Sequence, residues 1–306
     1  MPRVSVLFTC YNHIRYLPEA WQSVLDQTFT DWEIIAIDDG STDGTRDWLA
    51  DPTRQDPRVT VILNETNLGT YGSLNRALKA SKGEFIAILN DDDVWAPRKL
   101  EAQLALFAEH PEVGLVHTDG WFIDGDGNKR EDSPLGFEYP RFETGDIFAS
   151  LLHHNLIITS AALARRACFA AVGEFNEAYY GSADWEMWLR IAERWPMGCV
   201  AEPLTFYRVH GANASHKLER IWKDDQMLRE WIASKESEWI ARCDAAMPAA
   251  FAHNYAALGT VKTLNGDPVG GRRAYAESIR RSPGRFKSYL RWAATFLPKS
   301  AFRKLL

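Results

Sequence analysis

The first hundred residues alternate short apolar-rich runs with amphipathic stretches. The apolar-rich runs predict buried strands, at residues 4–8, 34–37, 59–63 and 85–89. Apolar side chains at helical spacing between them predict helices, near residues 17–28, 48–49 and 71–81. The last of these helices is expected to end at Gly83, because glycine is favoured just beyond a helix C-terminus. Strands that alternate with helices need crossover connections, so the pattern predicts an α/β fold with a mostly parallel sheet and helices on both faces.

The pattern changes after residue 113. Two strands are expected, at 113–117 and 120–123, and the chain looks helical from residue 221 to the end. The segment Asp124-Gly125-Asp126-Gly127-Asn128 superficially resembles a calcium loop, but its sixth position would be Lys129 rather than glycine and its twelfth Leu135 rather than glutamate. The Asp-Gly pair instead predicts a hairpin turn.

Three consecutive carboxylates, Asp91–Asp93, follow the strand predicted at 85–89. Like charges a few ångströms apart raise each other's pKa, so a bound cation would relieve such a cluster. Carboxylate oxygens suit Mg²⁺ or Mn²⁺, which are typically held by one or two carboxylates together with substrate phosphates. This favours a metal–diphosphate site. The alternative is a solvated turn that caps the helix expected near Pro97.

Polar segments follow three of the predicted strands. They are Thr9–Asn12, Asp38–Asp43 and Asp91–Asp93. Ligands of open parallel sheets bind beyond the carboxyl ends of the strands, so these segments are expected to converge on one edge and form a nucleotide pocket. For Asp38 and Asp43 the alternative is that they cap the turn and the following helix.

Composition and charge set further limits. The 306 residues are 46% hydrophobic and 25% charged, as in ordinary globular proteins. The cysteines are far apart and lack CxxC spacing, which argues against a zinc site or a disulfide framework and fits a reducing compartment: Cys10, Cys168, Cys199 and Cys243. Neither a signal peptide nor a run of eighteen apolar residues is visible, so a cytoplasmic protein is expected.

Several short segments are each weak evidence of a family when taken alone, but their order and spacing together are specific. They are Val4–Asn12, Ser23–Thr28, Glu33–Thr45, Asn67 with Gly69, Asn75 with Gly83-Glu84, Asp91–Asp93, Gly173–Phe175, Asp184–Arg190 and Tyr207–His210. Together they resemble a family-2 inverting glycosyltransferase of the GT-A fold. The resemblance covers about residues 3–215 and implies a Rossmann-like catalytic domain at 1–220. Its nucleotide-sugar half would be about 1–118 and its acceptor half about 119–220.

The resemblance also implies roles for individual residues. Asp91 would contact the ribose, and Asp93, with Asp92, would hold Mn²⁺ or Mg²⁺ through which the diphosphate is bound. Asp39 would accept a hydrogen bond from the imide N–H of uracil or thymine. The other residues expected in the nucleotide-sugar site are Thr9, Tyr11, Asn12, Asn67 and Arg208. For Tyr11 the alternative is a core aromatic.

Inversion at the anomeric carbon needs a base that takes the proton of the acceptor hydroxyl, and the resemblance places it at Asp184. The alternative is a helix-capping Asp without a catalytic duty. The family often has an acid just before this position, where Ala183 stands, and a basic residue near Thr70, where none stands; both departures leave the donor open. His210 is a candidate metal or phosphate ligand beside Arg208. His153-His154-Asn155 would line the acceptor site or lie at the surface.

The C-terminal region, 221–306, lies outside the resemblance and is expected to be a helical appendage that packs on the catalytic domain or dimerises. The net charge of the chain is −6, but residues 270–306 contain ten Lys or Arg and one acid. Basic residues interleaved with aromatics there suit an anionic membrane surface, at the inner face of the plasma membrane. The alternative is a solvated face of a packed helix. Nucleic acid is not expected as a partner, because the main body is acidic.

The leading hypothesis is therefore a metal-dependent inverting glycosyltransferase that uses a UDP- or dTDP-sugar, with a glycan or lipid-linked acceptor in cell-surface polysaccharide biosynthesis. A second hypothesis is a nucleotide-sugar-binding or scaffold protein with a degenerate catalytic site. A third, a nucleotidyltransferase, would be expected to show a Gly-rich, basic phosphate loop after the first strand, and Cys10–His13 is not one.

Overall fold

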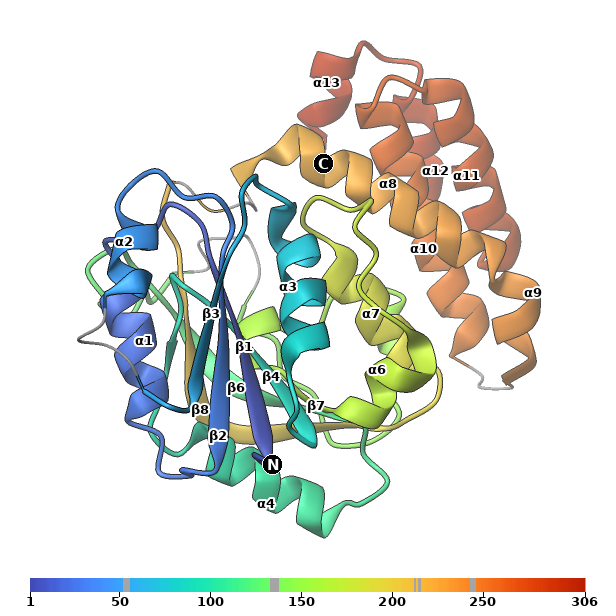
Figure 1. The fold of residues 1–306 in the computed structure, drawn as a ribbon. Coiled ribbons are helices and arrows are strands. Elements are labelled where there is room, and N and C mark those ends of the chain that lie inside the picture. The colour runs from blue at the N-terminus through green and yellow to red at the C-terminus, as the bar shows by residue number, and fades with distance from the viewer. Residues whose placement is uncertain (52–55, 133–137, 212, 214–215, 243–245, 306) are drawn as a thin grey trace. The chain divides into compact units, whose positions relative to one another are not determined.

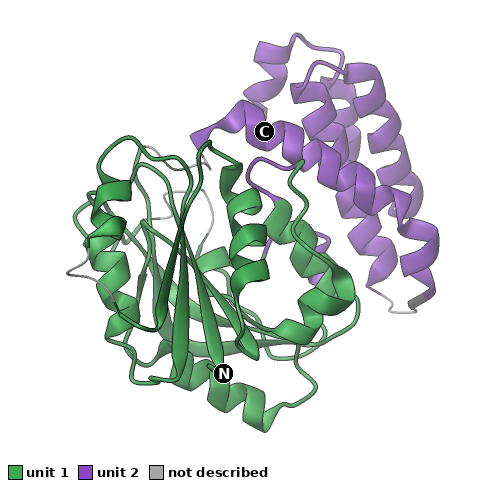
Figure 2. Ribbon diagram, in the orientation of Figure 1, with its two compact units in different colours: residues 1–147, 156–178, 183–213 green, residues 148–155, 179–182, 214–306 purple. Residues whose placement is uncertain are grey.

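The computed structural model describes residues 1–51, 56–132, 138–211, 213, 216–242 and 246–305. Leu135, Cys243 and Leu306 lie outside the described residues. The chain divides into two compact units (Figure 2). Unit 1 comprises residues 1–147, 156–178 and 183–213, and unit 2 comprises residues 148–155, 179–182 and 214–306.

Unit 1 is built on one eight-stranded sheet with the strand order β3-β2-β1-β4-β7-β6-β8-β5. The strands are β1 (Val4–Cys10), β2 (Trp32–Asp38), β3 (Val59–Leu63), β4 (Phe85–Asn90), β5 (Val94–Trp95), β6 (Leu115–Ile123), β7 (Leu163–Arg165) and β8 (Met197–Arg208). The pairs β1–β2, β2–β3, β1–β4 and β6–β8 are parallel, whereas β7 runs antiparallel to β4 and β6, and β5 to β8. The expected strand–helix alternation and mostly parallel sheet are confirmed.

Helices cover both faces of this sheet (Figure 1). They are α1 (Leu17–Leu25), α2 (Thr45–Ala50), α3 (Gly69–Ala80), α4 (Lys99–Glu109), α6 (Arg166–Val172) and α7 (Ala183–Ala192). Successive side chains of a strand point to opposite faces. Val4, Val6 and Phe8 of β1 accordingly join one core cluster with α1 and α4. The alternation of the buried apolar side chains thus fixes which face each helix covers.

Two sequence expectations about these elements were wrong. Helix α3 ends with Ser81 as its C-cap, not at Gly83. Gly83 is required for another reason: a Cβ there would lie 2.5 Å from the backbone nitrogen of Ser5. The two strands expected at 113–117 and 120–123 form the single strand β6, which continues past a register shift against β8 beside Asp119.

The hairpin expected at 124–128 is confirmed. The Asp124 carboxylate accepts the backbone N–H groups of Asp126 and Asn128, both at 2.9 Å. Gly127 has a φ of 85°, and an isolated antiparallel bridge joins Ile123 and Lys129. The carboxylate of Asp124 contacts only the turn in these hydrogen bonds, with Asp126 and Asn128 as donors, as expected for an Asx-type hairpin rather than a calcium loop.

Unit 2 is helical, as expected for residues 221–306. It contains α5 (Phe148–Leu151), α8 (Leu218–Ser234), α9 (Glu236–Trp239), α10 (Met247–Leu264), α11 (Pro268–Arg281), α12 (Phe286–Ala294) and α13 (Lys299–Arg303). Helices α10 and α11 pack closely: a Cβ at Gly259 would lie 2.8 Å from the ring of Tyr275. No helix in the described part of the chain combines the length and apolar composition that crossing a bilayer requires.

Candidate active site

The carboxyl ends of β1, β2 and β4 lie side by side, as expected. The backbone N–H of Asp39 donates to the carbonyl of Cys10 at 2.9 Å, and that of Asp91 donates to the carbonyl of Thr9 at 3.1 Å. The Thr9 hydroxyl donates to the Asn90 side chain at 3.1 Å. These contacts bring the segments after the three strands to one edge of the sheet, where parallel α/β folds bind ligands.

The segment after β1 is tied to the segment after β2 through Asn12. Asn12 has a φ of 56°, in the left-handed region that Asn tolerates better than most residues. Its backbone N–H donates to the Ser41 hydroxyl at 3.0 Å, and its side-chain oxygen accepts the Thr42 N–H at 2.8 Å. The Tyr11 side chain beside it is 45% exposed, so Tyr11 is not the core aromatic that the alternative predicted.

Asp39 is buried where β2 ends, and one of its carboxylate oxygens accepts two hydrogen bonds. The donors are the Asn64 side chain and the Leu68 backbone N–H, both at 2.8 Å. The Asn67 side chain accepts the Gly69 N–H at 3.0 Å, so it serves the turn before α3. The Asp39 carboxylate is therefore held in a fixed position from which it could recognise a ligand, whereas the Asn67 side chain is used by the turn.

Asp38 and Asp43 are turn residues, as their alternative predicted. Asp38 accepts the N–H groups of Gly40 and Ser41 at 3.3 Å. Asp43 accepts the N–H groups of Ile14 and Thr45 at 2.8 and 3.0 Å. Both carboxylates thus organise the backbone around the site.

The three consecutive aspartates face three different sets of partners. Asp91 is buried, and its carboxylate accepts the Tyr11 N–H at 2.9 Å and contacts His13 Nδ1 at 2.8 Å. Burial raises the pKa of Asp91, the His13 contact opposes this rise, and the charge of Asp92 adds to it. Burial alone would lower the pKa of His13, but the hydrogen bond to Asp91 and the nearby carboxylates raise it to about 9.

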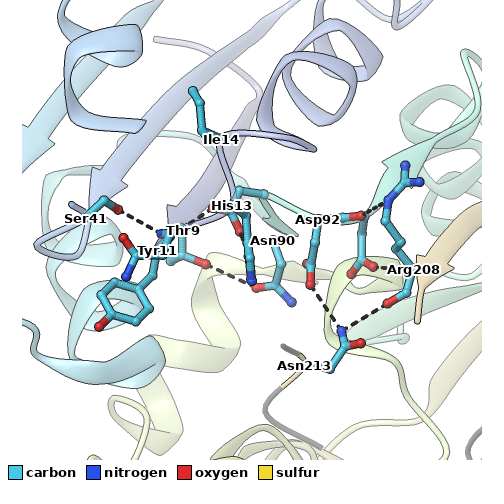
Figure 3. A network of polar contacts seen from close by, with 12 residues as sticks. Thr9, Tyr11, His13, Ile14, Ser41, Asn90, Asp92, Arg208 and Asn213 are labelled. Atoms are coloured by element: carbon cyan, nitrogen blue, oxygen red, sulfur yellow. Dashed lines mark hydrogen bonds and ion pairs between the residues drawn. The ribbon is translucent and has the colours of Figure 1, made fainter. Parts of the chain in front are cut away.

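Asp92 is the member of the triplet that faces histidines. Its carboxylate lies 3.0 Å from His210 Nε2. It also accepts the Asn213 side-chain amide at 3.3 Å (Figure 3). His13, Asp92 and His210 each offer one atom that could bind a metal ion. These three atoms all lie within 4.8 Å of one another. Asp92 and His210, both expected metal ligands, are thus brought together with His13.

Asp93 does not belong to this group, although it was expected to be the main metal ligand. It is 1% exposed. Its carboxylate accepts the Ser160 hydroxyl and, at 2.9 Å, the Arg208 backbone N–H. Burial, followed by the charge of Asp92, raises the pKa of Asp93 well above its usual range. The side chain turns into the protein, because its hydrogen-bond donors lie there.

The guanidinium of Arg208, which was expected in the nucleotide-sugar site, contacts protein acceptors. The side chain is 1% exposed and donates to the carbonyls of Asp92 and Asp124, at 2.8 and 3.1 Å. It also forms an ion pair with Glu19 at 2.6 Å. One of these donors thus holds the backbone carbonyl of Asp92.

The residues present fit a divalent cation. Ring nitrogens and a carboxylate are suitable donors for Mn²⁺, and a metal-binding histidine usually gives its second ring nitrogen to a carboxylate or carbonyl. Asp91 engages His13 Nδ1 in this way, which leaves Nε2 as the other nitrogen. Sequence reasoning missed His13, although its position directly after Tyr11-Asn12 at the end of a predicted strand was a usable signal.

Asp184 lies in the first turn of α7 and is buried. Its carboxylate accepts the Thr159 hydroxyl at 2.7 Å and the Tyr71 hydroxyl at 3.3 Å. These hydroxyl donors orient the carboxylate. The expected base thus lies in unit 1, whereas His153 belongs to unit 2, where its ring stacks on His253 with 4.4 Å between centroids.

A single sheet with this site at its carboxyl edge defines the class of protein: an α/β enzyme of the GT-A type. The profile described as Glycosyl transferase family 2 matches residues 5–173. The chain belongs to glycosyl transferase family 2 and is an enzyme of glycosyl transfer.

Two relatives illustrate the range of the family. An uncharacterized glycosyltransferase of Nostoc sp. is 32% identical over 225 residues, which are 69% of this chain and 66% of that protein. Chondroitin synthase of Escherichia coli is 30% identical over 226 residues, 74% of this chain and 32% of the synthase. This chain thus spans no more than about two thirds of the first relative and about a third of the second.

Solved structures share the fold. S. aureus TarS 1–349 in complex with UDP-GlcNAc matches with a TM-score of 0.60 at 18% identity, over 94% of this chain and 91% of that one. The mannosyltransferase PcManGT from Pyrobaculum calidifontis, in complex with GDP-Man and Mn²⁺, matches with a TM-score of 0.62 at 19% identity, over 99% of this chain and 83% of that one. At these identities the likeness establishes the GT-A fold alone.

Proposed function

We propose that the protein is a metal-dependent, inverting glycosyltransferase that moves a sugar from a UDP- or dTDP-sugar to a hydroxyl of a glycan or lipid-linked acceptor in cell-surface polysaccharide biosynthesis. The observation that carries the proposal is the grouping of His13, Asp92 and His210 at the carboxyl edge of a family-2 catalytic sheet. Chondroitin synthase, TarS with UDP-GlcNAc and PcManGT with Mn²⁺ support the acceptor class, the donor and the metal.

The donor would bind along the loops after β1 and β2. Tyr11 offers an exposed ring on which a nucleobase can stack, and Asp39 offers a fixed carboxylate to the imide N–H of uracil or thymine. Asn12 and Thr9 tie the loops that would surround the ribose, near the buried Asp91. An imide N–H is absent from adenine and cytosine, so such a contact would discriminate against both bases.

Asp92 and His210 would hold the cation, with His13 as the third ligand and Asp91 behind it. A bound divalent cation neutralises charge that develops on the leaving diphosphate. Asn213 and the positioning residue Arg208 keep Asp92 in place, through its side chain and its carbonyl respectively. This proposal moves the main metal role from Asp93 to Asp92.

Asp184 would take the proton of the acceptor hydroxyl as the new glycosidic bond forms. A general base must accept a hydrogen bond from the group that it deprotonates. Thr159 and Tyr71 each bring a hydroxyl to Asp184, so a carboxylate at this position is already oriented by hydroxyl donors before an acceptor arrives. Attack from the side opposite the leaving diphosphate gives inversion.

The test is hydrolysis and transfer with a panel of UDP-, dTDP-, GDP- and CMP-sugars, each with Mn²⁺ and with EDTA. The expected result is turnover of one UDP- or dTDP-sugar that Mn²⁺ supports and EDTA abolishes. The anomeric configuration of the product, read by proton NMR, should be opposite to that of the donor.

Other outcomes would contradict specific parts of the proposal. Binding of a nucleotide sugar without turnover would instead favour the degenerate binding protein. Turnover of a GDP-sugar alone would contradict the assignment of a UDP- or dTDP-sugar as the donor. Retained configuration would exclude the single displacement with Asp184 as base.

A further inference from the structure

The end of unit 2 exposes an unusual amount of apolar surface. Fourteen large hydrophobic side chains are exposed among the described residues, and half of them lie between residues 286 and 305. These seven are Phe286, Tyr289, Leu290, Trp292, Phe296, Leu297 and Leu305. A soluble protein rarely gathers so many exposed apolar side chains in one short segment unless something covers them. We call this set the apolar ridge.

The ridge follows from the spacing of residues in α12. Phe286, Tyr289, Leu290 and Ala293 recur at helical spacing and are all exposed, whereas Ser288 and Ala294 are buried. Phe286 is 70% exposed and Leu290 57%. The helix therefore packs on unit 2 through small side chains and leaves its large apolar side chains outside.

Basic residues accompany the ridge without acids. The sequence has no Asp or Glu after Glu277, and exposed cations stand within the segment at Lys287, Lys299, Arg303 and Lys304. Arg280 and Arg281, which precede the ridge, pair with Glu277 and Glu236. Among the described residues, no ion pair with an acid is formed by Lys287, Arg291, Lys299 or Lys304.

We propose that the α12–α13 segment docks on an anionic phospholipid membrane, with the apolar ridge in the interface and the lysines and arginines against the headgroups. The charge argues for this occupant over a second copy of the same face, because two ridges with only basic charges would repel each other. An amphipathic helix with apolar and basic faces is the form that binds such membranes without spanning them. Membrane docking would also bring the enzyme close to lipid-linked acceptors. Only this consequence rests on the proposed function.

The test is flotation of the full chain with vesicles of phosphatidylcholine alone and of phosphatidylcholine mixed with phosphatidylglycerol, without donor, acceptor or metal. The expected result is binding to the mixed vesicles only, weakened by added salt. A charge variant, K287Q/R291Q/K299Q/K304Q, should lose at least tenfold in partitioning, since each cation near an anionic surface is worth about fivefold. The matched control K79Q/R98Q/K129Q/R130Q removes four cations of unit 1 and should bind like wild type.

A second pair of variants tests the ridge itself. Phe286→Ser with Leu290→Ser should reduce binding at least tenfold, whereas Leu218→Ser with Val269→Ser, at 46% and 50% exposed positions, should not. Unchanged thermal melting and donor hydrolysis would show that the variants fold. Equal binding to both vesicle types would overturn the proposal. The absence of vesicle binding, together with a dimer that Phe286→Ser/Leu290→Ser disrupts, would overturn it as well. Because binding is measured without substrates, its failure is distinct from a failure of the proposed activity.

Discussion

Two carboxylate environments in unit 1 differ in what surrounds them. At the end of β4, Asp91 and Asp92 share their surroundings with two imidazoles, and charges lie close together. At the start of α7, Asp184 has hydroxyl partners in Thr159 and Tyr71. Acids close to one another need positive charge to remain ionised together, whereas a carboxylate with neutral donors can remain ionised by hydrogen bonding.

This difference suggests separate duties. The charged group is suited to hold a cation, because its repulsion is relieved when the cation binds. The hydroxyl-lined carboxylate is suited to exchange one of its donors for an acceptor hydroxyl. Substitutions in the two environments should therefore separate donor and metal binding from transfer.

The largest effect is expected for Asp92→Ala. Loss of this carboxylate removes the central ligand of the group and its contact with His210, so Mn²⁺-dependent turnover should fall at least 10³-fold, about 4 kcal/mol in the barrier. Calorimetry should show loss of Mn²⁺-dependent UDP binding. Asp126→Ala removes an exposed hairpin acid as a control and should leave both quantities unchanged. Mn²⁺-dependent UDP binding at wild-type affinity in Asp92→Ala would remove the assigned metal role.

Asp184→Asn should separate the two environments. The amide keeps the size of the side chain but is not a base, so transfer should fall by about 10²–10⁴-fold, the usual contribution of general-base catalysis. Donor and Mn²⁺ affinities should stay within about threefold of wild type, because the change leaves the charged group intact. Asp47→Asn, an exposed acid in the first turn of α2, is the matched control. If Asp184→Asn retained transfer, the base would have to be another residue.

The sequence predicted the fold and the edge of the sheet at which the site lies, because both follow from local patterns. Apolar runs marked β1, β2 and β4, and the polar residues after them marked the edge. The directions of individual side chains could not be predicted in the same way. His13 meets Asp91 across 78 positions of the chain, and Arg208 reaches Glu19 across 189. Within three consecutive aspartates, only tertiary contacts decide which carboxylate faces the histidines.

Asp93→Asn is expected to have the smallest effect on metal binding. It tests directly which of the three aspartates faces the histidines. Asparagine can still accept the Arg208 N–H, and its amide can donate to the Ser160 hydroxyl, so the buried contacts can be kept. Because Asp93 turns away from the histidines, the Mn²⁺ affinity of the variant should change less than about tenfold. A loss as large as that of Asp92→Ala would return the metal role to Asp93.

The same variant has a signature in the pH dependence of stability. The pKa of Asp93 is raised in the folded protein, first by burial, so the folded state holds this proton after the unfolded state has released it. Stability contributed by the protonated group is therefore complete below the ordinary Asp pKa, about 4, and is lost as the pH rises through the raised value. Denaturant unfolding in EDTA should show this loss in wild type and not in Asp93→Asn, so the variant should gain stability relative to wild type as the pH increases. Parallel pH profiles for the two proteins would mean that the pKa of Asp93 is not raised in the folded protein. The nearby positive charge of Arg208, which lowers this pKa, would then outweigh the effect of burial.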